Sequence, residues 1–150
     1  MKDKRQAVLV IALGATIAAA VYMVAQLNGQ ERAPAGNFTN AATAEVRDAQ
    51  GQVVLRGQFV LADEEDDDIE RKATLKAAGN DADAAGEAEV EFAKAAATNQ
   101  EIEFSVRNLQ AGVALTFVID GVEVGNATVD RRGRAELEVE VPLPGTTPAR

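Results

Sequence analysis

The feature that most restricts the fold of this chain is a strict alternation of apolar and charged residues. Ala88, Val90 and Phe92 alternate with three glutamates, and the same pattern recurs at residues 101–107 and 134–141. Successive side chains of a strand point to opposite faces of its sheet, so a period of two buries one face and exposes the other. The alternation therefore predicts antiparallel sheet with one face in a core and one in water.

Short turn motifs separate the alternating segments. Asp120-Gly121 lies between two runs rich in β-branched residues, and Asp-Gly is a strong signal for a two-residue hairpin. An aspartate followed three residues later by a glycine precedes three further segments. Asp favours the first position of a type I turn, and Gly tolerates a positive φ at the last. These motifs are Asp48–Gly51, Asp83–Gly86 and Asp130–Gly133.

Together these signals predict an all-β fold. About eight short strands in about 100 residues are typical of a β-sandwich or a small barrel. We expect one acidic antiparallel β-sandwich domain (or small barrel) over residues 43–142, with the apolar segment 113–119 at its centre. Residues 143–150, rich in proline, predict a disordered tail. The expected strands are 43–47, 52–61, 69–77, 87–93, 101–107, 113–119, 122–129 and 134–141.

The N-terminal part of the chain has a different character. Basic residues precede an uncharged and mostly apolar stretch at 7–27, which as a helix is long enough to cross a bilayer. We expect residues 1–27 to form a hydrophobic helix, either a membrane anchor or a cleaved signal segment. Residues 28–42 contain Gly, Pro and Asn without any period, which predicts a flexible linker.

The charges around that stretch predict where the β-domain resides. Basic flanks stay on the cytoplasmic side of a membrane, so the remainder of the chain is expected outside the cytoplasm. This gives an extracytoplasmic protein, periplasmic or on the cell surface, anchored in the inner or plasma membrane by residues 7–27. If the segment is cleaved, the protein is secreted.

The composition argues against catalysis and against nucleic-acid binding. The chain has no Cys, His or Trp, and its one serine is Ser105. The usual general base, the thiol nucleophile and the best transition-metal ligands are therefore missing. A net charge of −9 repels phosphate backbones. We expect no enzymatic activity and no nucleic-acid partner.

One acidic run is the strongest candidate for a metal site. Clustered carboxylate oxygens suit Ca²⁺, whereas contiguous like charges commonly form a solvated loop, and a basic partner protein is a third reading. Calcium is the one cofactor that this chain suggests. The run consists of Asp63, Glu64, Glu65, Asp66, Asp67 and Asp68.

Two glutamate ladders line strand faces, Glu87/Glu89/Glu91 and Glu136/Glu138/Glu140. Like charges directly opposite each other on neighbouring strands are destabilising, so we expect the ladders to lie apart or to face basic residues. Protection of edge strands against pairing is the favoured explanation for them, and binding of a cation or a partner is the alternative.

These observations favour a membrane-tethered, extracytoplasmic β-domain that acts in protein–protein interaction or as an accessory or structural subunit of an envelope complex. Its partners would be the membrane, through the N-terminal helix, and a protein. The alternative is a Ca²⁺-binding or cation-responsive acidic β-module.

Overall fold

A computed structural model gives the conformation of residues 34–64, 67–94 and 98–144. The predicted helix at 1–27 and the predicted tail from 145 onward lie outside the described residues. Within the described part, no helix combines the length and apolar character needed to cross a membrane.

The prediction of an all-β antiparallel fold is confirmed. Each observed strand coincides with a predicted one, and the bounds differ by three residues or fewer. The strands are β1 (Thr43–Arg47), β2 (Val53–Glu64), β3 (Asp68–Ala77), β4 (Ala85–Ala93), β5 (Asn99–Arg107), β6 (Ala114–Ile119), β7 (Val122–Thr128) and β8 (Ala135–Pro142).

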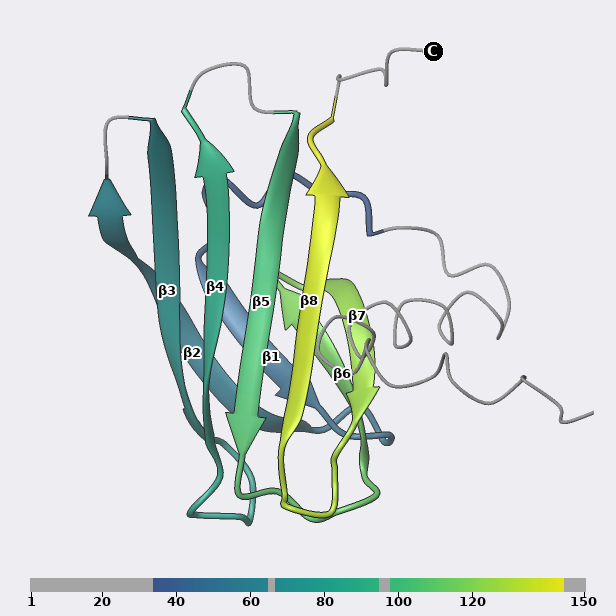
Figure 1. The fold of residues 1–150 in the computed structure, drawn as a ribbon. Helices are drawn as coiled ribbons and strands as arrows, with labels where there is room; N and C mark the ends of the chain where they lie inside the picture. Colours follow the sequence, from purple (N-terminus) through teal and green to yellow (C-terminus); the bar gives the residue numbers. More distant parts are fainter. Residues whose placement is uncertain (1–33, 65–66, 95–97, 145–150) are drawn as a thin grey trace, which may run out of the picture. The chain divides into compact units, whose positions relative to one another are not determined.

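All eight strands belong to one antiparallel sheet with the order β7-β6-β1-β2-β3-β4-β5-β8. Figure 1 shows β3, β4, β5 and β8 side by side in one layer, with β1, β6 and β7 behind them. The long strand β2 belongs to both layers, because it pairs with β1 on one side and with β3 on the other. The sheet is therefore nearly barrel-shaped.

The two end strands, β7 and β8, also contact each other. A Cβ atom added to Gly125 of β7 would lie 2.8 Å from both methyl carbons of Leu137 on β8. The absence of a side chain at Gly125 thus leaves the room that Leu137 occupies. The sheet closes here by packing, since the register of β7 and β8 joins them to other strands.

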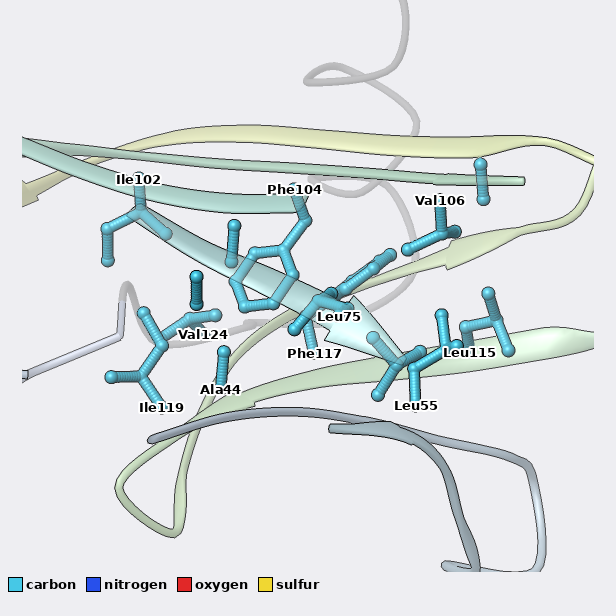
Figure 2. Packing of buried hydrophobic residues seen from close by; sticks show 14 of the residues in the cluster. Ala44, Leu55, Leu75, Ile102, Phe104, Val106, Leu115, Phe117, Ile119 and Val124 are labelled. Atoms are coloured by element: carbon cyan, nitrogen blue, oxygen red, sulfur yellow. The ribbon is translucent and has the colours of Figure 1, made fainter. Parts of the chain in front are cut away.

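The core fills the space between the two layers (Figure 2). Phe104 and Phe117 stack in a tilted arrangement with ring centroids 4.9 Å apart, a geometry that aromatic pairs favour. Aliphatic side chains from β2, β3, β5 and β6 surround them, including Leu55, Leu75 and Ile102. The inward residues of the alternating pattern are those buried here, so the core follows from the period of two.

The turns follow their predicted chemistry in three of four places. Asp120 and Gly121 have φ of 48° and 82°, as a type I′ hairpin turn requires. In the motifs at 48–51 and 130–133 the glycine N–H donates to the aspartate C=O, and each glycine has φ of 77°.

The motif at Asp83–Gly86 does not form the predicted turn. There the turn closes earlier, with the N–H of Ala84 donating to the C=O of Asp81. Gly86 lies inside β4, where a Cβ atom would approach the carbonyl oxygen of Ser105 to 2.6 Å. Gly86 therefore allows β4 and β5 to approach closely, whereas the glycines of the other two motifs allow a turn with a positive φ.

The expectation that residues 113–119 lie at the centre of the fold is wrong for their place in the sheet. The strand β6 is next to the end strand β7. Phe117, Val118 and Ile119 are nevertheless buried, and Val118 lies opposite Glu45 of β1 in register. The apolar residues on both faces of this segment correctly indicated that it is buried. They did not indicate its place in the sheet, because a strand near the end of a curled sheet can also be buried on both faces.

Candidate functional site

The outer face of β3, β4, β5 and β8 carries the densest charge in the described residues. The inward residues of these strands belong to the core, so the alternate residues all point outward. Two register rows cross the four strands in the order β3, β4, β5, β8. They are Glu70-Glu91-Glu101-Glu140 and Lys72-Glu89-Glu103-Glu138.

A third row, Thr74-Glu87-Ser105-Glu136, lies next to these two, and we call the three rows the acidic face. The row beyond it, Lys76-Ala85-Arg107, carries two cations. Lys72 is the one cation among the residues of these three rows. Glutamate faces glutamate directly across most strand boundaries of the first two rows. Since opposed like charges destabilise a sheet by a few tenths of a kcal/mol per pair, the face costs stability in isolation.

The expectation that the glutamate ladders lie apart is therefore only partly met. The strand β5 separates the β4 ladder from the β8 ladder, as expected. However, β5 contributes Glu101 and Glu103, which lie opposite glutamates on both sides. The basic residues considered as partners for the ladders are Arg56, Arg71, Lys72 and Arg107. Lys72 lies opposite Glu89, and Arg107 lies on the same outward side of β5, opposite Ala85 and one row from Glu87.

Two of those basic residues have other partners. The Nε of Arg71 donates to the C=O of Thr39, and Arg56 pairs with Glu45 on the other layer.

Lys72 sets the local electrostatics of the acidic face. Its ammonium pairs with Glu70 on its own strand and lies 3.4 Å from Glu89 across the strand boundary. The hydrogen bond from Lys72 lowers the pKa of Glu70, and the same bond raises the pKa of Lys72. Burial, followed by a hydrogen bond with Glu70, raises the pKa of Glu89. Glu89 is thus the carboxyl of this group that takes up a proton first as the pH falls.

Protection of edge strands explains one ladder and not the other. The strand β8 is an end of the sheet, and charged side chains together with Pro142 oppose its pairing with another chain. The strands β4 and β5 are paired on both sides and have no free edge. The favoured explanation therefore does not extend to the glutamates of β4 and β5.

The acidic run lies at the turn between β2 and β3. Asp63 and Glu64 end β2 and Asp68 begins β3, while Glu65 and Asp66 lie outside the described residues. The described residues contain no group of three or more acidic side chains arranged to hold a metal ion. Calcium binding by the run stays a prediction. Thermal unfolding with and without Ca²⁺ tests it, because a ligand of the native state raises Tm.

The basic turn between β7 and β8 is organised by its own aspartate. The carboxylate of Asp130 accepts hydrogen bonds from the N–H groups of Arg132 (2.7 Å) and Arg134 (2.9 Å). The bond from Arg134 is the larger cause that lowers the pKa of Asp130. The side chains of this turn are exposed, and the turn lies at the opposite end of β8 from Glu140.

Comparison of the chain with protein-family models, with curated proteins and with solved structures found no match. What the molecule does must therefore be argued from its own surface, and the acidic face is the feature of that surface that internal structure explains least.

Proposed function

We propose that this chain is an exported, non-enzymatic interaction domain that binds a basic surface of a partner protein through its acidic face. Residues 1–27 would tether it to the membrane, or direct its secretion if cleaved. In the tethered form it would act as an accessory or structural subunit of an envelope complex.

The observation that carries this proposal is the opposition of glutamates on strands without a free edge. Glu103 of β5 lies between Glu89 and Glu138, and Glu101 lies between Glu91 and Glu140. These positions have no edge to protect, and Thr or Lys at any of them would remove the repulsion. Local rules of sheet stability are characteristically broken where a site serves a function, so a partner that neutralises the face is the physical explanation we favour.

The sign of the charge specifies the chemistry of the partner. A positive surface gains from long-range attraction and from relief of the internal repulsion. A second copy of the same face would double the number of opposed glutamates, so charge complementarity excludes self-pairing of this face. Among macromolecules, a basic protein surface is the favoured occupant, because phosphate backbones and anionic headgroups carry the wrong sign.

The chemistry of the side chains supports a role without catalysis. The chain offers neither His nor Cys, and Ser105 lies on the acidic face between Glu87 and Glu136 without a neighbouring cation in its row. A serine flanked by carboxylates, in a chain without histidine, lacks the usual general base that activates a nucleophile.

A labelled oligolysine peptide tests the acidic face directly by fluorescence anisotropy with the full-length protein. The triple variant Glu89→Gln/Glu103→Gln/Glu138→Gln neutralises one row while keeping the side-chain shape. We expect it to bind the peptide about tenfold more weakly than the wild type, with the difference shrinking at high salt.

The matched control removes the same number of charges elsewhere. Asp81, Asp83 and Glu123 are exposed and lie off the acidic face, and the variant Asp81→Asn/Asp83→Asn/Glu123→Gln should bind the peptide nearly as the wild type does. Equal losses in both triple variants would mean that only net charge matters and would refute the proposal. Cell fractionation tests export separately, since full-length protein in the cytosol would contradict it.

A further inference from the structure

The segment before β1 lies across one end of the sheet (Figure 1, dark blue). We call residues 34–42 the strap. They form the described part of the predicted linker and belong to no strand. Phe38 and Ala41 of the strap are nevertheless 3% and 2% exposed. The last residue of the strap continues the β1–β2 ladder, since the Phe59 N–H donates to the Ala42 C=O at 2.9 Å. Other groups must hold the rest of the segment against the sheet.

Gln100 of β5 is the first holding group. It occupies an inward position that Ile102 and Phe104 continue along the strand, and it is 1% exposed. The Phe38 N–H donates to its Oε1 at 2.8 Å, and its Nε2 donates to the Gly36 C=O at 2.6 Å. A buried amide is costly unless it is hydrogen-bonded, and the strap supplies both of these partners.

Gln100 is also the one buried polar or charged side chain among the described residues. Its two bonds pair with the main chain of residues 36–38 as a neighbouring strand would. The amide is therefore placed to recognise an extended peptide backbone.

Two further side chains hold the strap by its main chain. The Nε of Arg71 on β3 donates to the Thr39 C=O at 2.8 Å. The carboxylate of Asp120, in the turn between β6 and β7, accepts from the Ala42 N–H at 3.1 Å and from the Thr43 N–H at 2.7 Å. These hydrogen bonds are made to backbone groups, so they do not depend on the side chains of the strap.

Two positions of the strap supply selectivity. The Phe38 side chain joins the hydrophobic core cluster. Its ring folds back over Gly36, where an added Cβ atom would lie 2.5 Å from the ring carbon Cζ. A Cβ atom two residues before the phenylalanine would displace the ring, so the site favours glycine at that position.

We propose that Gln100, Arg71 and Asp120 form a peptide-binding socket whose ligand is an extended segment with a Gly-x-Phe pattern, and that the strap is its displaceable internal ligand. Main-chain hydrogen bonds for affinity and a pocket for one side chain are the general means by which proteins bind extended peptides. The strap belongs to no strand, so its opening would release Phe38 and Ala41 from the core while leaving the pairing of the eight strands in place. The socket is separate from the acidic face, so this inference does not rest on the proposed function.

The test uses the full-length chain and a fluorescein-labelled peptide with the sequence of residues 34–43. In the wild type the strap occupies the socket. Phe38→Ala removes the ring, and Gly36→Ala pushes it out without removing core atoms. We expect both variants to bind the peptide about tenfold or more tightly than the wild type. A peptide with Ala in place of its Phe should not bind.

Two receptor variants locate the binding. Adding Gln100→Leu to Phe38→Ala should abolish binding, whereas Gln110→Leu, the same change at an exposed loop position, should leave it unchanged. The triple glutamine variant of the acidic face should also leave it unchanged.

The proposal is overturned if folded Phe38→Ala and Gly36→Ala proteins, each with a β-type far-UV spectrum, bind the two peptides equally. Loss of that spectrum in both variants would overturn it as well, since the strap would then be an indispensable part of the core.

Discussion

Glu45 and Glu103 are outward-facing glutamates on the two layers of the same sheet, yet their surroundings are opposite. The carboxylate of Glu45 lies 2.7 Å from Arg47 and 2.6 Å from Arg56. The hydrogen bond from Arg47 is the largest cause that lowers the pKa of Glu45. Glu103 instead lies in register between Glu89 and Glu138. Glu45 is therefore neutralised by two arginines within the domain, whereas Glu103 faces a glutamate on each neighbouring strand.

The largest expected effect comes from reversing the satisfied charge. Glu45→Lys removes two ion pairs and places a third cation beside two arginines. We expect a loss of about 1–2 kcal/mol in the free energy of unfolding, measured by urea denaturation of the full-length protein. A loss no larger than that of a surface substitution such as Gln110→Leu would show that the cluster contributes nothing.

The same substitution on the acidic face should act in the opposite direction. Glu103→Lys replaces two repulsions with two attractions, so we expect a gain of about 0.5–1 kcal/mol. Glu103→Gln should give about half of that gain. If Glu103→Lys is destabilising, glutamates in register on this face do not repel each other appreciably.

Salt distinguishes the two layers without mutation. Raising NaCl from about 0.05 M to about 0.5 M screens the repulsion on the acidic face, so Tm of the wild type should rise by about 2 °C. The rise should be smaller in Glu103→Lys and larger in Glu45→Lys, where the added cation also needs screening. A wild-type Tm that falls with salt would mean that the ion pairs of Glu45 outweigh the repulsion.

The smallest expected effect is a difference in pH dependence. Burial raises the pKa of Glu89 above that of an ordinary glutamate, so in the window between those two pKa values the native state binds more protons than the unfolded state. Stability must then fall as pH rises through that window. The groups around Glu89 are Lys72, Glu70, Glu87, Glu91 and Glu103.

For Glu45 the pKa is lowered, so its contribution is lost as pH falls below the ordinary glutamate range. The free energy of unfolding should be measured by urea denaturation across mildly acidic pH. Glu89→Gln should reduce the fall in stability with rising pH, and Glu45→Gln should reduce the loss of stability with falling pH. Identical pH profiles for the two variants would contradict the assigned directions.

The sequence predicted where the strands lie along the chain, but for most strands it did not predict which other strands pair with them. The alternation of Ile102 and Phe104 with polar residues identified β5 and its inward face, because a period of two is a local property. The pairing of β5 with β8 depends on long-range packing, so nothing local to Glu103 indicated that Glu138 would lie beside it.

The socket escaped prediction for a related reason. Phe38 is surrounded by Gly, Asn and Thr, a composition that favours a loop, and Gln100 resembled the polar end of a strand. Its inward position follows from counting back from Ile102, which is the signal that could have identified it. The partners of Gln100 come from more than sixty residues away, and local pattern does not carry such information.

The strand order has a consequence for how the chain folds. The strands β2 to β5 form a continuous meander of neighbours, while β1 must wait for residues 114–119 before its second side is paired. Local hairpins form early and long-range pairings late, because closing a long loop costs entropy first. We therefore expect the glutamates of β4 and β5 to meet early in assembly of the sheet, so that their repulsion slows folding as well as destabilising the folded state.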